Sequence, residues 1–335
     1  SLRRSSSSTG SARSSPPRSL RCSRLVPARL AGDLCSRSQS NLTAAFLDDE
    51  QFEALWPDTG PRSTIHGFIE PLMVGTGDVD TGAPSILIRD GLALLPGDLR
   101  LSAREDDLSD AWSKCLDEKA REFRVMSAFW RVLQGAAKRA GSHLILMDLG
   151  PNLGSINRAA LVASHFVVIP VAPDLFSIQG LRNLGPTLRR WRTDWVKRRD
   201  MNPEKALDLP PGDMHPVGYV VMQHAVRLDR PVLAYGKWIR RIPSTYREAV
   251  LYETGEGDDV QADPRCLALM KHYRSLVPMA MEARKPVFLL RNADGAIGGH
   301  AGAVQEARQD FARLLDRILT ATGLSFPDDD GRPSA

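Results

Sequence analysis

The sequence predicts an α/β fold, a doubly wound and mostly parallel sheet with helices on both faces. Residues 144–147 form a continuous apolar run of strand length, typical of a strand buried in a parallel sheet, and the run ends at Asp148. A helical pattern follows over residues 156–163, and a second apolar run, residues 166–169, comes after it. Strand, loop, helix and strand succeed one another within roughly forty residues, as in βαβ units.

Asp148 stands at the carboxyl end of the first of these strands. In open α/β sheets ligands bind at that edge, and a carboxylate placed there can hold Mg²⁺ beside a phosphate. The structural alternative is that Asp148 serves only as a turn or helix-capping residue. Pro170 and Pro173 end the second strand and direct another loop to the same edge.

Charge divides the chain into a basic arm and a slightly acidic remainder. The 335 residues are enough to bury a full core, and the formal net charge is +4. Residues 1–40 hold eight Arg against one Asp, so they carry +7 and the rest of the chain carries −3. Nucleic-acid binding by the remainder therefore has to rest on local patches.

The arm itself, with thirteen Ser and no aromatic residue in residues 1–40, has no helical or strand period. This composition predicts disorder. Three interpretations stay open for it: a transit peptide, a flexible arm that contacts DNA phosphates, or a stretch outside the protein's own reading frame.

The four cysteines are far apart and form no C-x-x-C pair, which argues against a disulfide framework or a zinc site. No apolar run approaches the ~18 residues that span a bilayer. Residues 326–335 are acidic and proline-broken, so we expect a disordered tail and no membrane helix. A cytoplasmic location is the natural expectation.

Between the arm and Asp148 the pattern predicts five elements. They are a short helical segment (42–55), a helix capped by Ser63 or Thr64, a loop (75–84), a hairpin (86–88 with 92–97) and a helix (123–140). In the last helix the apolar residues, Trp130 among them, recur on one side, which favours core packing over a cofactor site. Further along, residues 217–222 predict a buried strand and residues 305–321 a closing helix.

Residues 188–199 contain six cations and one acid, with Trp191 and Trp195 between them. Clustered Arg and Lys can neutralise DNA phosphates, so this is the best DNA-binding candidate in the predicted domain. The alternative is a solvated helix face whose tryptophans pack inward. The candidate DNA-binding residues are Arg189, Arg190, Arg192, Lys197, Arg198 and Arg199, with a second patch at Lys237, Arg240 and Arg241.

Two stretches of this chain resemble motifs of the ParA-type partition ATPases, the group that also includes the MinD cell-division ATPases. The matching residues are Asp148, Pro151, Asn152, Leu153 and Gly154, as in the family's Walker B turn, and Pro170, Pro173, Ser177 and Gly180, as in the segment after its next strand. Either motif alone is weak, but both in order at family-like spacing are strong. Residues 39–43 resemble the tail of the family's second strand motif, and residues 285–290 its last strand.

The resemblance covers about residues 39–320 and implies a P-loop NTPase-like fold with a role in plasmid or chromosome partition. We expect an arm (1–38), a ParA-like domain (39–325) and a tail (326–335). In that family ATP with Mg²⁺ makes a homodimer that binds DNA without base specificity, and a centromere-binding partner protein triggers hydrolysis. By resemblance Asp148 serves the Mg²⁺ side, and nucleotide contacts fall on Gln39, Asn41, Pro173 and Gln223.

The chain departs from the family at its amino end. The Gly-rich loop Lys-Gly-Gly-x-Gly-Lys-(Thr/Ser) is absent, the first lysine is Lys114, and the two aspartates of the second motif fall on Cys35 and Arg37. Losing the Lys and two backbone donors removes ~4–9 kcal/mol, or about three to six decades of affinity. We therefore expect no appreciable ATP binding, and a missing phosphate-loop strand that exposes residues 144–147 and leaves the chain poorly soluble or partly folded.

Two other functions stay open. One is a non-enzymatic DNA- or partner-binding module that has lost nucleotide chemistry. The other keeps the superfamily and changes the reaction, as in an amidoligase or an electron-transfer ATPase. The electron-transfer protein would need cluster-binding cysteines, and the surroundings of Cys115 and Cys266 do not resemble such sites.

Overall fold

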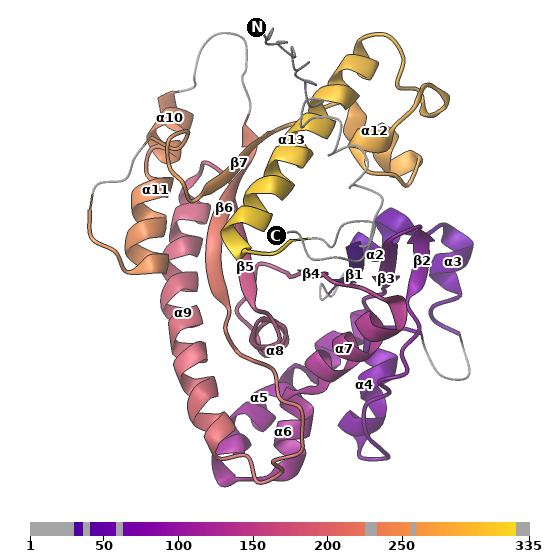
Figure 1. The fold of residues 1–335 in the computed structure, drawn as a ribbon, viewed down its shortest axis with the longest axis vertical. Coiled ribbons are helices and arrows are strands. Elements are labelled where there is room, and N and C mark those ends of the chain that lie inside the picture. The colour runs from indigo at the N-terminus through magenta and orange to yellow at the C-terminus, as the bar shows by residue number, and fades with distance from the viewer. Residues whose placement is uncertain (1–29, 36–40, 58–62, 225–232, 256–258, 326–335) are drawn as a thin grey trace, which may run out of the picture.

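Two sheets carry the fold, and the chain passes from the first to the second between β4 and β5 (Figure 1). The computed structural model describes residues 30–35, 41–57, 63–224, 233–255 and 259–325. The α/β fold class expected from the sequence is confirmed.

The first sheet has the strand order β2-β3-β1-β4. β1 runs parallel to β3 on one side and to β4 on the other, and β2 pairs antiparallel with β3 as the predicted hairpin. The second sheet has the order β5-β6-β7, with all strands parallel. The bounds are β1 Leu30–Cys35, β2 Ile86–Arg89, β3 Leu92–Leu95, β4 Ile145–Asp148, β5 Phe166–Val171, β6 His215–His224 and β7 Cys266–Lys271.

Helices connect and cover these strands. In chain order the α-helices are α2 Asn41–Phe46, α3 Asp49–Glu53, α4 Ile65–Val74, α5 Glu105–Lys114, α6 Ala120–Met126, α7 Ala128–Ala140, α8 Ser155–Val162, α9 Leu175–Asp200, α10 Leu233–Ile239, α11 Ile242–Thr245, α12 Leu276–Glu282 and α13 Gly299–Thr322. A π-helix, Tyr246–Leu251, follows α11. Short 3-10 helices are η1 Leu99–Arg104, η2 Cys115–Asp117, η4 Val287–Leu289 and η5 Asn292–Asp294.

Local signals set several of these boundaries. Thr64 caps α4 as expected, because its hydroxyl accepts the Gly67 N–H at 3.3 Å. The helix predicted over residues 123–140 is instead two helices, α6 and α7, which meet at Ser127. The Ser127 hydroxyl donates to the Arg124 carbonyl at 3.1 Å at this break. Trp130 is half-buried, packs against the largest core cluster as predicted, and donates its ring N–H to Asp208 at 3.0 Å.

Both faces of β3 are covered, because its successive residues point to opposite sides of the sheet and pack into different clusters. Leu95 packs into the largest core cluster, which α4 to α9 build on one face. Leu94 packs into a smaller cluster on the other face with Leu47 and Leu55, from the region of α2 and α3.

The second sheet is enclosed in the same way. Tyr219 and Val221 of β6 face α9, α11 and the π-helix, and neither is exposed. Val220, between them, faces the opposite cluster, where α13 packs with Phe311 and Ile318 across β6 and β7 (Figure 1).

No ladder joins β4 to β5 in the part of the chain that the structure describes. β4 pairs with β1, β5 pairs with β6, and α8 links the two strands. The predicted strand at residues 144–147 is confirmed, but its burial on both faces is wrong, because Leu146 is 43% exposed at the open edge.

Two further sequence predictions are wrong. β1 lies inside the segment 1–38 that was expected to be disordered, and it forms ladders with two strands; the rest of that segment lies outside the described residues. Residues 285–290 form no strand, because Pro286 cannot donate to a ladder and the next residues turn into η4, where Val287 and Leu290 pack with α12 and α13.

Among the described residues, no helix is long and apolar enough to cross a membrane.

Candidate functional site

Asp148 lies where the sequence analysis places it, at the carboxyl end of β4. Its backbone is in register with Cys35 of β1, and its side chain is half-buried. The loop after β4, residues 149–154, leads into α8, and the loop after β5 leads into α9. Both loops leave the carboxyl ends of parallel strands, which is the edge where α/β sheets bind ligands.

Asn157 of α8 holds the loop that follows Asp148. Its side-chain amide donates to the Gly150 carbonyl at 2.7 Å and to the Asn152 carbonyl and side chain at 2.6 and 2.7 Å. Asn157 is 3% exposed, so these bonds are shielded from water. Sequence reasoning missed this residue because an Asn within a helix matches no motif.

Glu105 of α5 closes the other end of the same loop. Its carboxylate accepts the backbone N–H groups of Ser155 and Ile156, the latter at 3.3 Å, at the start of α8. A carboxylate at a helix N-terminus is favourable because it meets unpaired N–H groups and the positive end of the helix dipole. The sequence carries no signal for this contact, since Glu105 and Ser155 are fifty residues apart.

The loop after β5 is built by two of its own side chains. The Asp174 carboxylate accepts the Ser177 N–H at 2.7 Å and caps α9, and the Ser177 hydroxyl accepts the Ala172 N–H at 2.9 Å. Ser177, a residue of the family-like motif, therefore shapes the loop in this structure. Pro173 lies inside it and is half-buried, while Phe176 is 86% exposed beside it.

The donors present fit Mg²⁺ with ATP only in part. Mg²⁺ is usually bound through one or two carboxylates together with phosphate oxygens, and Asp148 can supply one carboxylate. The described residues contain no group of three or more His, Cys, Asp and Glu that would hold a metal without phosphates. A phosphate cradle needs a Gly-rich loop with a Lys, and no such loop occurs in the 335 residues.

The other expected nucleotide contacts are not brought together by anything the structure describes. Gln39 lies outside the described residues. Asn41 begins α2 and Gln223 lies near the end of β6, but the side chains of both are outside the described part of the chain. Pro173 is the one of these four whose side chain the structure describes, and it follows β5, in the second sheet.

Most of the basic side chains of α9 bond to backbone carbonyls or stack on an aromatic ring of the same chain. Arg192 donates to the carbonyls of Asp213 and Met214, both at 2.7 Å, and burial lowers the pKa of Arg192. Arg199 donates to the Pro211 carbonyl at 2.9 Å, and the Arg189 guanidinium lies 3.1 Å from the Tyr252 ring centre. Trp191 and Trp195 are 4% and 0% exposed, so the tryptophans pack inward as the structural alternative expects.

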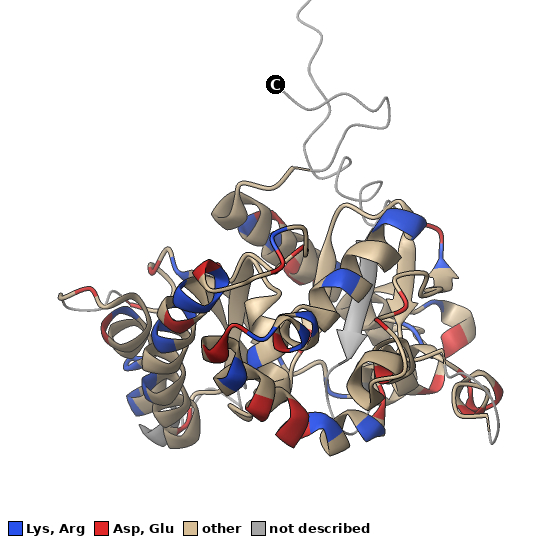
Figure 2. Ribbon diagram, turned by 90° about the horizontal axis from the view of Figure 1, so that it is seen from below, with Lys and Arg blue, Asp and Glu red and all other residues tan. Residues whose placement is uncertain are grey.

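Arg198, another of the candidate DNA-binding residues, is 7% exposed. Its guanidinium donates to the backbone carbonyls of Trp112 and Asp194. Arg190 and Lys197 remain exposed on α9, and Lys237 and Arg240 are exposed on and after α10. Lys237 and Arg241 flank the Trp238 ring at 5.1 Å each. Seen from below, cations and acids are interspersed over several helices (Figure 2).

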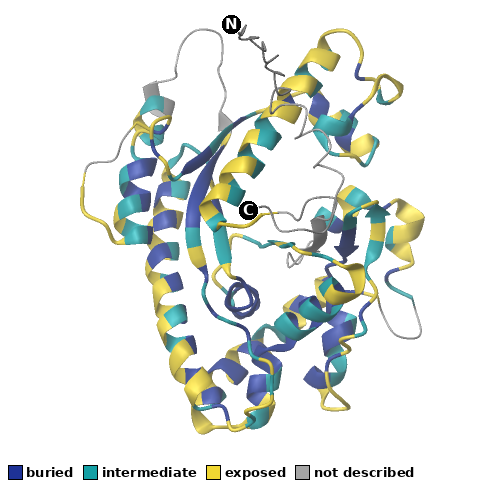
Figure 3. Ribbon diagram, viewed as in Figure 1, coloured by how far each residue is buried: buried dark blue, intermediate teal, exposed yellow. Residues whose placement is uncertain are grey.

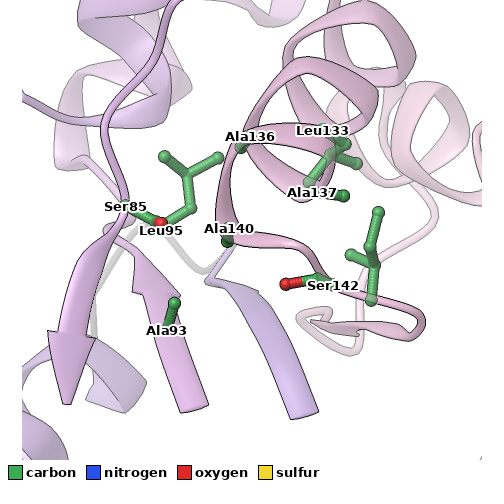
Figure 4. Close-up of a pocket in the computed structure, with 9 residues that line it drawn as sticks. Ser85, Ala93, Leu95, Leu133, Ala136, Ala137, Ala140 and Ser142 are labelled. Atoms are coloured by element: carbon green, nitrogen blue, oxygen red, sulfur yellow. The ribbon is translucent and has the colours of Figure 1, made fainter. Parts of the chain in front are cut away.

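Asp148 lines neither of two hollows formed by the described residues. One is a cavity of about 10 Å³ between β3 and α7, lined by Leu95, Leu133 and Ala136 among other small or apolar residues (Figure 4). It has room for about one water molecule. The other is a surface depression of about 510 Å³ at the end of α9, lined by both cations and acids, including Arg199, Lys205 and Asp208.

Comparison with known proteins gives one family and several similar structures. Residues 38–201 match the AAA domain family. An uncharacterized protein of Methanocaldococcus jannaschii is 30% identical over 119 residues, which is 36% of this chain and 39% of that protein. The chain therefore matches well under half the length of this curated relative.

Among solved structures, a protein of Corynebacterium diphtheriae is similar with a TM-score of 0.58 at 20% identity, over 78% of this chain and 89% of that one. McdA of Cyanothece in its complex with ATP is similar with a TM-score of 0.54 at 11% identity, over 91% of this chain and 90% of that one. At these identities the likeness concerns the fold.

Proposed function

We propose that this chain, whose residues 38–201 match the AAA domain family, is a partition-type homologue of the ParA-type P-loop NTPases that retains the metal-side carboxylate, Asp148, and lacks the phosphate cradle. It acts in the segregation of plasmid or chromosomal DNA as a homodimer, together with a centromere-binding partner protein, in the cytoplasm. ATP with Mg²⁺ is the ligand of the group, and this chain on its own holds it poorly.

The single observation that carries the proposal is the open position between β4 and β5. Each strand is paired on one side only within the described chain, and β4 ends at Asp148. A phosphate loop follows a strand and precedes a helix, and it must lie beside the carboxylate that serves the metal. The strand that would carry the loop is therefore the one that would occupy this position.

The expected loss of ATP-binding free energy follows from the groups that a phosphate loop would supply. A Lys and two backbone N–H donors contribute roughly 4–9 kcal/mol to phosphate binding, which is about three to six decades in the dissociation constant. Asp148 cannot compensate, since a carboxylate repels phosphate unless a metal ion lies between them.

Calorimetric titration with Mg-ATP tests the proposal on the full chain. We expect no saturable heat up to millimolar nucleotide. A dissociation constant in the low micromolar range would contradict it, because another loop would then have to cradle the phosphates. Asp148→Asn is the matched control, since any residual binding through the metal should disappear in that variant.

A second candidate function is non-enzymatic binding of duplex DNA without base specificity. The exposed cations of α9 and of the region around α10, Arg190, Lys197, Lys237 and Arg240, favour it. Their binding should weaken steeply with salt, because neutralising phosphates releases counterions. The residues that the sequence suggests for DNA binding are Arg189, Arg190, Arg192, Lys197, Arg198, Arg199, Lys237, Arg240 and Arg241.

Substitution of the four exposed cations tests whether they, rather than residues 1–29, bind DNA. Replacing Arg190, Lys197, Lys237 and Arg240 by Gln should abolish DNA retention in a gel-shift assay while the chain stays folded. Removing residues 1–29, which hold seven Arg, should have little effect. If DNA is bound only when residues 1–29 are present, the helical cations form a solvated face and this second function fails.

The electron-transfer alternative finds little support in its two candidate cysteines. Cys115 and Cys266 are both buried. Burial raises the pKa of Cys115 to about 12 and that of Cys266 to about 11, so both thiols stay protonated at neutral pH. A thiolate is the form that binds metals and clusters.

A further inference from the structure

Two arginines, one buried and one half-buried, lie where α5, α8 and α9 meet, and neither has an acidic partner within 4.0 Å in the described chain. They are Arg158 of α8 and Arg198 of α9, and both guanidinium groups stack on Trp112 of α5, at 4.6 and 4.2 Å from its ring centre. Arg158 also lies 6.0 Å from the ring centre of Trp191. Three helices thus converge on two positive charges.

The two guanidinium groups differ in how their donors are used. Arg198 donates from Nε to the Trp112 carbonyl at 2.7 Å and from Nη1 to the Asp194 carbonyl at 3.0 Å. Arg158 offers five N–H donors. Its one bond within the described residues runs from Nη2 to the Leu108 carbonyl at 3.5 Å, and its Nε is buried without an acceptor.

No acid nearby neutralises Arg158. Glu105 attracts it from a distance, but the Glu105 carboxylate is engaged by the N–H groups of Ser155 and Ile156. Burial and the repulsion of Arg198 and Arg190 lower the pKa of Arg158 to about 10, so the group is still a cation at neutral pH. A buried charge without a partner is costly, and stacking on two indole rings offsets the cost only in part.

We propose that Arg158 binds a small oxyanion of the phosphate class at the junction of α5, α8 and α9, with Arg190 and Arg198 adding positive potential. The planar fork of an arginine matches the oxygens of a phosphoryl group, and two parallel N–H bonds can form at once. Arg158 is half-buried, so part of the side chain is reachable from solvent. The site does not use Asp148, and it does not rest on the proposed function.

Intrinsic tryptophan fluorescence reports directly on this site, because Trp112 and Trp191 contact the Arg158 guanidinium. We would titrate the full chain with inorganic phosphate, holding ionic strength constant with sodium chloride. The proposal predicts a saturable change with a midpoint in the millimolar range, as expected for a few charge-assisted bonds partly open to solvent. A flat titration up to ~50 mM would overturn it, since the site would then be weaker than this estimate.

Three variants make the result specific. Arg158→Met should lose the response, and Arg158→Lys, which keeps the charge and loses the fork, should shift the midpoint at least about tenfold. Arg241→Met removes the cation beside Trp238 on another helix and should respond like the wild type. If Arg158→Met does not fold, the Lys variant decides, and an unchanged midpoint there would show that the arginine pair is only a packing device.

Discussion

β6 and β4 both contain an apolar run and pair with parallel neighbours, yet their environments differ. β6 has a neighbour on each side, and Tyr219, Val220 and Val221 at its centre are at most 5% exposed, whereas Met222 after them is 42% exposed. β4 has a neighbour on one side in the described chain, and Leu146 is 43% exposed. The sequence does not predict this difference in environment, because both strands contain a continuous apolar run.

The difference lies in backbone pairing rather than in side-chain burial alone, because Met222 is 42% exposed although β6 has neighbours on both sides. β4 has one side open within the described chain. α8, which follows β4 in the chain, is almost entirely buried (Figure 3), but a helix does not pair with the open side of a strand. The open side of β4 adjoins Asp148, and under the proposed function this is the position that a phosphate-loop strand would occupy.

The largest effect should come from filling that position. We predict that a strand–loop–helix carrying a Gly-rich loop with a Lys, fused ahead of β1, raises Mg-ATP affinity by about three to six decades. Calorimetric titration of the fused and unfused chains measures it. Replacing the loop Lys by Ala in the fused chain is the control, and a fused chain that unfolds no more cooperatively than the original would argue that the position is not a strand site.

The second largest effect should come from placing a carboxylate in each strand and comparing the losses of unfolding free energy. Val221→Asp buries a carboxylate without a partner and should cost more than about 4 kcal/mol of unfolding free energy. Leu146→Asp places the same group at a half-open edge and should cost less than about 1.5 kcal/mol. Urea denaturation of both variants gives the comparison, and equal losses would mean that β4 is enclosed after all.

Two neighbouring cations of α9, Arg198 and Lys197, differ in the same way, since the first is buried and the second is exposed. Arg198→Met removes a buried group that donates to the Trp112 and Asp194 carbonyls and should cost about 2–3 kcal/mol, because those carbonyls lose a charged donor. Lys197→Met, one residue earlier on the exposed side, should stay within about 0.5 kcal/mol of the wild type. Thermal unfolding followed by circular dichroism distinguishes them, and comparable losses would remove the distinction between held and free cations.

The smallest effect concerns pH and the first half of the fold. His66 is 1% exposed near the end of β3, and burial lowers its pKa below the ordinary value of 6.5. The unfolded chain then binds the proton more tightly, so the contribution of this group to stability is present above pH 6.5 and is lost as the pH falls below it. His66→Gln should flatten the pH dependence of the urea midpoint between pH 7 and pH 5, and an unchanged slope in that variant would assign the dependence to other groups.

Much of the fold follows from sequence pattern alone. The apolar runs at β4, β5 and β6, the Thr64 cap and the hairpin of β2 and β3 are all local signals, and the structure confirms each of them. The break at Ser127 was missed because the apolar period continues through it. β1 was missed because a short strand next to an Arg- and Ser-rich arm has no period of its own, and its pairing depends on β3 and β4.

The candidate site was predictable only where one residue carries the signal. Asp148 stands at a strand end in the sequence and in the structure alike. Asn157 and Glu105 shape the loop after it through contacts that no motif records, and Glu105 comes from another helix. The cations of α9 cluster in the sequence, but the tertiary fold decides that Arg192 and Arg198 bind carbonyls while Arg190 and Lys197 face solvent.

Amide hydrogen exchange of β4 and β6 tests most directly whether one strand position stands open. Backbone groups at an unpaired edge exchange readily, whereas those in a ladder on both sides are protected up to the global stability. We predict slow exchange for residues 217–222 of β6 and much faster exchange for residues 145–148 of β4, with the fused strand–loop–helix restoring protection to the latter. Equal protection of the two strands in the original chain would contradict the account, because β4 would then already have its second neighbour.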